Sequence, residues 1–407
     1  MESRTERWLL PEGMEELVPP ESLRLERMRR SLLDLFSLWG YEIVTPPFIE
    51  YLESLLTGTG EDLELHTFKL IDQLTGRMMG IRADMTPQVA RIDARRLRRD
   101  GPSRLCYAGT VLHTLPEGIS GGRSPVQVGA ELYGHAGWES DCEIVCLMLE
   151  ALETAGVGPV HLDVGHVGIF RALAHRTALG HEREIALHEA LQRKAGSEAR
   201  ELLNAWEVDA RYADALVALV DLDGEPSVLE RAARELAVGG EKVARALADL
   251  GALVGAVRAR RPDVELHVDL AELRGYRYHT GSVFAAFVPG YGREVARGGR
   301  YDEIGGVFGR ARAATGFSAD LKTLIALRAS DRDAAEEDAI GAPWSDDAAL
   351  HDAIRELRSH GERVIQRLPG EDPGGARKLE RRDGRWVVVV GAVSPGGSSA
   401  TEGESRG

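Results

Sequence analysis

Residues 126–134, Val-Gln-Val-Gly-Ala-Glu-Leu-Tyr-Gly, combine side chains that could hold a small polar ligand. Hydrophobicity alternates along them with period two, as in a β-strand. The polar face presents Gln127, Glu131 and Tyr133 around Gly129, which leaves space between them. At ~3.3 Å per residue the amide and the carboxylate stand ~13 Å apart, enough to bracket a ligand the size of an amino acid. An ordinary half-exposed strand explains the same pattern, so the other segments of the chain must distinguish a ligand site from a solvated strand.

Two further polar clusters stand at the ends of predicted strands. The first, residues 82–86, reads Arg-Ala-Asp-Met-Thr, and the second, residues 274–279, reads Arg-Gly-Tyr-Arg-Tyr-His. Each cluster alone has a structural explanation, such as a helix cap or an ion pair. Together with the polar strand they favour a ligand site built from three segments.

The residue types in these clusters suit an α-amino acid. Its ammonium group needs acceptors, a role that Asp84, Thr86 and Gln127 could fill. Its carboxylate needs a cation, and the fork of an arginine such as Arg274 binds a carboxylate bidentately. If the ligand side chain is an imidazole, a buried carboxylate such as Glu131 can accept a hydrogen bond from a ring N–H.

The elements that must position these residues are mostly short strands, with several amphipathic helices. Strands are predicted at residues 41–44, 67–71, 78–81, 104–111, 126–133, 160–164, 265–270, 283–287 and 315–318, and helices at 21–39, 88–97, 139–155 and 320–327. Thr86 followed by Pro87 predicts a helix N-cap and first helical residue. Residues 298–302, Gly-Gly-Arg-Tyr-Asp, predict a tight loop before a helix.

Changes in composition predict the domain organisation. Residues 169–261 are rich in Ala, Leu, Glu and Arg and predict a helical insertion in a β-rich domain that spans residues 1–329. Residues 330–338 read as a linker, and residues 330–391 as a small α/β piece with a βαβ unit and a hairpin. Residues 392–407 are rich in Gly, Ser and Glu and predict a disordered tail. The fold class expected is α+β.

Composition limits the functions to consider. The chain has 407 residues and a net charge of −15, which disfavours a large nucleic-acid surface. The basic stretch at residues 91–99 is interpreted as a solvated helix face. No segment has the length of a membrane span or the pattern of a secretory signal. Three cysteines, without His or Cys partners at metal spacing, indicate reduced core residues of a cytoplasmic protein without a metal site.

The motifs together resemble the catalytic domain of histidyl-tRNA synthetase, a class II aminoacyl-tRNA synthetase. Residues 81–86 resemble its loop for the histidine ammonium group, residues 126–134 its Gln- and Glu-bearing strand, and residues 273–284 and 298–302 its two histidine motifs. The resemblance covers residues 10–327 and implies an antiparallel sheet with flanking helices. It adds four residues to the expected histidine-binding set, namely Met85, Tyr278, His279 and Tyr301.

Departures from the synthetase pattern bear on the activity. The second class II motif has an arginine for the ATP α-phosphate and a glutamate where this chain has His113 and Leu115. The third motif ends in an arginine where this chain has Thr323. Neither a neutral imidazole nor a hydroxyl replaces a fixed cation at a developing phosphate charge. Only about 50 residues remain for a C-terminal domain that should have ~100.

A histidine pocket without these arginines resembles the regulatory subunit of ATP phosphoribosyltransferase, as does the form of residues 269–281. The resemblance implies a homodimer that assembles with the short-form catalytic subunit into a hetero-octamer, with L-histidine as feedback effector and with no cofactor, tRNA or membrane as partner. Two alternatives remain open, a divergent histidyl-tRNA synthetase and a synthetase-like enzyme that charges another acceptor.

Overall fold

The computed structural model describes residues 9–57, 61–116, 122–273, 275–276, 278–328, 339–371 and 377–390. The chain divides into two compact units, residues 1–329 and 330–407. The predicted linker at 330–338, the predicted tail and Arg274 lie outside the described residues. Within the described residues no helix has the length and apolar character needed to cross a membrane.

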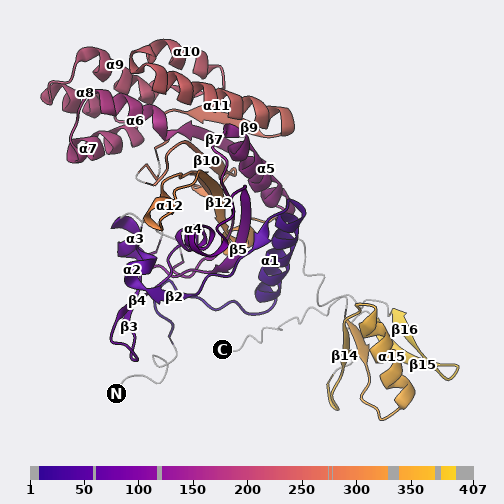
Figure 1. The fold of residues 1–407 in the computed structure, drawn as a ribbon. Helices are drawn as coiled ribbons and strands as arrows, with labels where there is room; N and C mark the ends of the chain where they lie inside the picture. The colour runs from indigo at the N-terminus through magenta and orange to yellow at the C-terminus, as the bar shows by residue number, and fades with distance from the viewer. Residues whose placement is uncertain are drawn as a thin grey trace, which may run out of the picture. The chain divides into compact units, whose positions relative to one another are not determined.

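A nine-stranded sheet forms the centre of the first unit (Figure 1). In spatial order its strands are β1 (Glu42–Ile43), β5 (Ser103–Thr110), β6 (Val126–Tyr133), β12 (Ala314–Asp320), β11 (Glu294–Arg300), β10 (Ser282–Phe287), β7 (His161–His166), β9 (Glu265–Asp269) and β8 (Asp223–Gly224). Neighbouring strands from β5 to β7 are all antiparallel, whereas β1–β5 and β7–β9 pair in parallel. The strand that bears Gln127 and Glu131 is therefore central, with both of its faces covered.

Helices cover both faces of this sheet. Helices α1 (Glu21–Leu38) and α5 (Trp138–Thr154) pack on one face, where Val128, Ala130 and Leu132 of β6 join the large hydrophobic core. Helix α4 (Thr86–Ile92), continued by a π-helical turn at Asp93–Leu97, and the short α12 (Ile304–Val307) border a smaller core on the other face. Helix α13 (Leu321–Leu327) follows β12. The alternation of residues along β6 thus separates a packing face from a face that can bind.

Two smaller groups of elements complete the first unit. Strands β2 (Ile49–Tyr51), β4 (Met78–Ile81) and β3 (Lys69–Ile71) form a three-stranded antiparallel sheet beside α2 (Leu52–Leu55) and α3 (Glu61–His66). Between β7 and β9 the chain forms the helical insertion, α6 (Val167–Arg176), α7 (His181–Gln192), α8 (Gly196–Ala205), α9 (Ala210–Ala218), α10 (Val228–Glu235) and α11 (Glu241–Arg260), with 3₁₀ turns at Leu219–Asp221 and Ala237–Gly239. These helices form a layer beside β7 and β9 (Figure 1).

The second unit has the βαβ unit and the hairpin expected from the sequence. Strands β13 (Ile340–Ala342) and β14 (Val364–Gln366) are parallel and are joined by α15 (Ala348–Ser359). Strands β15 (Arg377–Arg382) and β16 (Arg385–Val390) form the antiparallel hairpin beside β13. Asp383 and Gly384 form its turn with positive φ angles, as a two-residue hairpin requires.

Two local predictions are wrong. Thr86 is the first helical residue of α4 rather than its N-cap, and the Asp84 carboxylate accepts the hydrogen bond from the Thr86 backbone N–H instead, at 3.0 Å. This frees the Thr86 hydroxyl for the site. Residues 298–300 are not a loop but the end of β11, paired with β10 and β12 on both sides. Glycine is required at this strand position because the Phe284 ring and the Gly316 carbonyl crowd Gly298.

Candidate functional site

Glu131 is the centre of the site, on the binding face of β6. Its side chain is 1% exposed, and both carboxylate oxygens accept hydrogen bonds from phenols. Tyr107 on β5 donates to Oε1 at 2.9 Å, and Tyr301, directly after β11, donates to Oε2. A Cβ at Gly316 on β12 would overlap the carboxylate, so glycine is required opposite Glu131. Burying a charged carboxylate with only neutral hydrogen-bond partners costs free energy, and a ligand that also bonds to it would offset this cost.

Three polar residues beside this carboxylate form one hydrogen-bonded group. The Asp84 carboxylate accepts a hydrogen bond from the side-chain NH₂ of Gln127 at 2.7 Å. The side-chain oxygen of Gln127 accepts from the Met85 backbone N–H at 2.9 Å. The Thr86 and Tyr107 hydroxyls lie 3.1 Å apart. Asp84 and Thr86 therefore reach the site directly, and Gln127 orients Asp84. The Met85 side chain is buried in the smaller core, and only its backbone takes part.

Aromatic residues from the segments around 278 and 301 close the other side. The rings of Tyr278 and Tyr301 stack with centroids 5.0 Å apart, and the Tyr278 and His279 rings meet edge to face at 5.3 Å. The Tyr278 hydroxyl is buried and has no hydrogen-bond partner among the described residues. A buried hydroxyl without a partner carries a free-energy cost that a bound polar ligand would remove.

These residues line a cavity of about 340 Å³. Its lining joins segments that are distant in sequence, represented by Thr86, Glu131, Tyr278, His279 and Tyr301, with Asp84 at its margin. The volume is at the lower end of the range for ligand pockets, ~300–1,000 Å³. A buried acceptor, an unpartnered hydroxyl and aromatic walls fit a small ligand that has both a ring and polar groups.

Burial determines the charges in this cavity. It raises the pKa of the Glu131 carboxyl to about 8, although the hydrogen bonds from Tyr301 and Tyr107 act in the opposite direction. Burial also lowers the pKa of His279 to about 4, so this imidazole is neutral at physiological pH. The pKa values of Tyr107, Tyr278 and Tyr301 lie well above their usual range, again chiefly through burial. One carboxyl group of the cavity therefore titrates near neutral pH, and Arg297, which also lines the cavity, provides a fixed positive charge.

A buried ion pair fixes the end of β11 and with it Tyr301. The Arg300 guanidinium lies 3.0 Å from Asp141 on α5, and it donates to the Ser140 hydroxyl at 2.8 Å and the Gly137 carbonyl at 2.9 Å. Both charged side chains are almost fully buried, with 7% and 2% exposure. The next residue, Tyr301, is thereby held toward Glu131.

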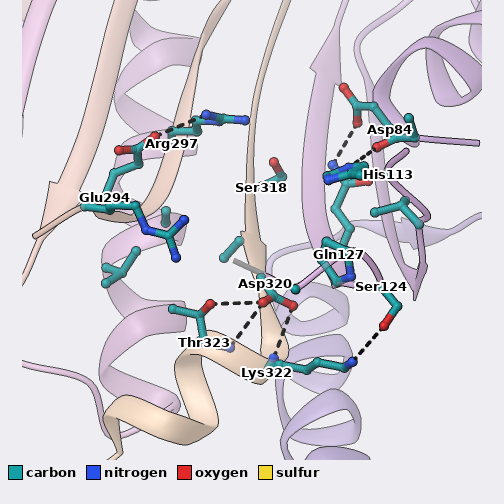
Figure 2. Close-up of a pocket in the computed structure, with 18 of the residues that line it drawn as sticks. Asp84, His113, Ser124, Gln127, Glu294, Arg297, Ser318, Asp320, Lys322 and Thr323 are labelled. Atoms are coloured by element: carbon teal, nitrogen blue, oxygen red, sulfur yellow. Dashed lines mark hydrogen bonds and ion pairs between the residues drawn. The ribbon is translucent and has the colours of Figure 1, made fainter. Parts of the chain in front are cut away.

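A second cavity of about 1080 Å³ adjoins the first, and Asp84 lines both. Figure 2 shows His113, Lys322, Asp320 and Thr323 around it. His113 bonds the Ala83 carbonyl through Nε2 at 2.9 Å, and its buried Nδ1 has no partner among the described residues. Because a carbonyl only accepts, Nε2 carries the proton and Nδ1 is an acceptor in the neutral ring. An imidazole held in this way does not replace the fixed guanidinium fork of an arginine at a phosphate.

Other polar groups of the second cavity bond to the protein itself (Figure 2). Asp320 caps α13 by accepting from the Lys322 and Thr323 backbone N–H groups at 3.2 and 3.3 Å. Lys322 Nζ contacts Glu15 at 2.8 Å and the Ser124 hydroxyl at 3.2 Å. The lysine charge is therefore already paired with a carboxylate.

Two family models match the chain. One described as histidyl-tRNA synthetase matches residues 13–324, and one described as ATP phosphoribosyltransferase subunit HisZ C-terminal domain matches residues 337–389. An ATP phosphoribosyltransferase regulatory subunit of Thioalkalivibrio sulfidiphilus is 60% identical over 389 residues, 94% of this chain and 98% of the relative. The chain belongs to the family of ATP phosphoribosyltransferase regulatory subunits.

Solved structures agree with the synthetase-like fold of this family. An ATP phosphoribosyltransferase regulatory subunit/histidyl-tRNA synthetase from Bacillus halodurans is 27% identical, with a TM-score of 0.79 over 89% of this chain and 94% of that one. A chain of the ATP phosphoribosyltransferase HisG:HisZ complex from Thermotoga maritima is 18% identical, with a TM-score of 0.57 over 75% of this chain and 98% of that one. The predicted fold class, α+β with a class II synthetase-like sheet, is confirmed.

Sequence reasoning missed Tyr107, which provides one of the two phenols at Glu131. Period two in residues 104–111 puts it on one face of a strand, but it does not show that this strand lies next to β6. The register places Tyr107 opposite Gly129, where a Cβ would lie 2.6 Å from the phenol oxygen. The glycine that we interpreted as space for a ligand therefore makes room for a tyrosine.

Proposed function

We propose that this chain binds L-histidine in the smaller cavity as the feedback effector of ATP phosphoribosyltransferase, the first step of L-histidine biosynthesis. In this proposal it activates a short-form catalytic subunit and has no aminoacylation activity. The observation that supports it best is Glu131, a buried carboxyl between two phenols and beside the unpartnered Tyr278 hydroxyl. An imidazole ring has two nitrogens that can satisfy both groups.

Each end of the ligand has a proposed partner. The ring contacts Glu131 and Tyr278, and His279 and Tyr301 form the walls. The ammonium group bonds Asp84 and Thr86, with Gln127 behind Asp84. Arg274, expected from the sequence to pair with the carboxylate, stays a prediction. Residues 1–329 would form the histidine-binding domain, and residues 330–391 the small C-terminal piece.

The proposed assembly is a homodimer of this chain within a cytoplasmic hetero-octamer. Its support is that the HisG:HisZ complex from Thermotoga maritima contains a chain of similar fold. The lack of aminoacylation is proposed because His113 and Thr323 stand at the positions of the two synthetase arginines, and neither supplies a cation to a nucleotide phosphate.

Mixing the purified chain with a short catalytic subunit tests the proposal. We expect the phosphoribosyltransferase rate to rise, histidine to inhibit the mixture, and the two chains to co-elute in gel filtration as one larger complex. The catalytic subunit alone and with a Glu131→Gln chain are the controls, and the variant should activate while resisting histidine. Separate elution over a wide concentration range, without any change in rate, would overturn the proposal.

A further inference from the structure

The helical insertion contacts the same chain segment that lines the histidine cavity. Within residues 272–279, Gly275, Tyr278 and His279 line the cavity, whereas the Tyr276 ring packs against the insertion. The Tyr276 ring meets Phe170 on α6 edge to face at 5.1 Å. It also stacks on His188 of α7, with centroids 5.0 Å apart and planes 30° apart.

Hydrogen bonds fix this contact at three points. His188 Nε2 donates to the Leu273 carbonyl at 2.9 Å. Arg171 donates to the Tyr276 carbonyl at 2.5 Å, and its guanidinium lies 4.9 Å from the centre of the Tyr276 ring. The Tyr276 hydroxyl donates to the Glu184 carboxylate on α7. Three polar side chains of the insertion therefore converge on one short turn.

The turn is tight enough to transmit a displacement. The Gly275 carbonyl accepts from the backbone N–H groups of Tyr278 at 2.7 Å and His279 at 2.8 Å. Gly275 has φ +66°, in the left-handed region, and a Cβ there would lie 2.7 Å from the His279 ring. Tyr276 directly follows the glycine that these bonds hold, and Tyr278 in turn stacks on Tyr301, the phenol that donates to Glu131.

We propose that Arg171, Glu184 and His188 are positioning residues for the histidine pocket. They touch no ligand; they hold Tyr276 and thereby set where Tyr278 and His279 meet the ligand. This inference rests on the proposed function, since histidine is the ligand it concerns. Linkage makes the effect reciprocal, so bound histidine must in turn stabilise the contact between the insertion and the turn.

Histidine titration by calorimetry of the full-length Tyr276→Phe variant tests the proposal. The variant keeps the ring contacts and loses only the bond to Glu184, so histidine Kd should rise about three- to tenfold. The matched control is Tyr41→Phe, which loses a phenol–carboxylate bond of 2.9 Å to Glu143; neither residue lines the cavity. The control should bind histidine within about twofold of wild type. Thermal midpoints should fall by similar amounts in both variants.

A conservative replacement separates positioning from general stability. His188→Leu removes the donor to the Leu273 carbonyl and should weaken histidine binding, whereas His188→Gln supplies an N–H at a similar reach and should restore it. Wild-type Kd in both Tyr276→Phe and His188→Leu would overturn the positioning role. A wild-type chain that binds no histidine would instead overturn the proposed function, so the two failures are distinguishable. If His188→Leu does not fold, Tyr276→Phe decides.

Discussion

The two neighbouring cavities differ in where their polar groups find partners. In the smaller one, the Tyr278 hydroxyl is buried without a partner in the described chain, and Glu131 is bonded by neutral phenols. In the larger one, Lys322 is paired with Glu15 and Asp320 caps a helix. The larger cavity also contains an atom that is buried and unpartnered among the residues described, His113 Nδ1, but its Lys322 and Asp320 side chains are already bonded within the protein. Volume alone would favour the larger cavity, whereas the proposed histidine site is the smaller one.

The same comparison gives a physical reason for the proposal that this synthetase-like fold binds histidine and does not activate it with ATP. Recognition of an imidazole needs a few neutral donors and acceptors held at fixed positions, and tyrosines on β5 and after β11 supply them. Phosphate chemistry needs cations aimed at developing charge. Single side chains provide that charge, so the proposed loss requires only two replacements, at His113 and Thr323.

Pyrophosphate exchange should show the largest contrast between the cavities. Each lost donor at a developing charge lowers a rate by ~10²–10³, so histidine-dependent ATP–pyrophosphate exchange should stay at background. The measurement uses the purified chain with saturating histidine, and an active histidyl-tRNA synthetase serves as positive control. Exchange above background would place a working nucleotide site in the larger cavity and support the divergent synthetase alternative.

Removing the ion pair that holds β11 should have the next largest effect. Arg300→Leu leaves Asp141 buried and unpaired, so the free energy of unfolding should fall by about 3–5 kcal/mol, and histidine binding should weaken with Tyr301. Arg297→Leu on the same strand is the control for stability alone, because Arg297 also lines the smaller cavity. Its ion pair with Glu294 is more exposed, so the expected loss is about 0.2–1 kcal/mol. Urea unfolding measures both, and equal losses would show that Arg300 has no special role.

The pH dependence of histidine binding should reveal the titrating carboxyl of the smaller cavity. Because burial raises the pKa of Glu131 to about 8, this carboxyl is protonated in the empty site at pH 7. We expect the bound ring and Glu131 to share one proton. Below the ligand imidazole pKa of ~6.5, ring and carboxyl together carry two protons before binding, so one must be released when histidine binds. Above the Glu131 pKa they carry none of these protons, so one must be taken up. Affinity should therefore peak between these values and fall up to about tenfold per pH unit outside them.

Glu131→Gln is the control for this profile, measured by calorimetry in buffers of different ionisation enthalpy. The ligand ammonium group titrates with both proteins alike, so the difference between them reports the carboxyl. Above pH 8 the histidine affinity of the variant should fall less steeply with pH than that of wild type, because one fewer proton is taken up on binding. Identical profiles above pH 8 would mean that Glu131 does not titrate there.

The same carboxyl should also make folding pH-dependent. Its folded pKa of about 8 lies above the ordinary glutamate value of 4.5, so the folded state binds more protons between these values. Stability should therefore fall as pH rises from about 5 to 8, and the loss should be smaller in Glu131→Gln. Thermal midpoints across this range provide the measurement, and parallel curves for the two proteins would contradict the buried titration.

The smallest effect is expected for Lys322→Ala in the larger cavity. Its ammonium group contacts Glu15 and Ser124 and does not line the smaller cavity, so histidine Kd should stay within about twofold of wild type. Calorimetry of this variant beside Tyr107→Phe, which removes a donor to Glu131, sharpens the contrast. A loss of histidine affinity in Lys322→Ala as large as in Tyr107→Phe would mean that the cavities are not separate.

Most of the architecture followed from local patterns, and the misses have physical causes. Alternation in residues 126–133 predicted a strand with two distinct faces, and β6 has them. The sequence could not show that β6 is central, because strand order depends on distant pairings. For the same reason, no local pattern indicated that Tyr107 would lie across from Gly129. Glycines at 298–299 suggested a loop, whereas close packing between three strands requires them.

The site prediction had a similar limit. Residue types predicted Asp84, Thr86 and Glu131, and the fold brings all three to the lining of one cavity. Residue chemistry alone could not show that two of the predicted residues do not line this cavity. The Gln127 side chain bonds to Asp84 instead, and the Met85 side chain is part of the smaller core. The contact between Tyr276 and the insertion joins segments about 90 residues apart and leaves no local pattern.

A calorimetric titration of histidine into wild type and Glu131→Gln tests the central claim most directly. The substitution keeps the side-chain size and replaces a charge-assisted hydrogen bond, worth about 1.5–3 kcal/mol, by a neutral one worth about 1. The exposed Glu265→Gln, on β9 of the same sheet, is the matched control. We predict that Glu131→Gln binds histidine about tenfold more weakly, within a range of about two- to thirtyfold, while Glu265→Gln matches wild type. Equal dissociation constants for all three proteins would contradict a histidine site at Glu131.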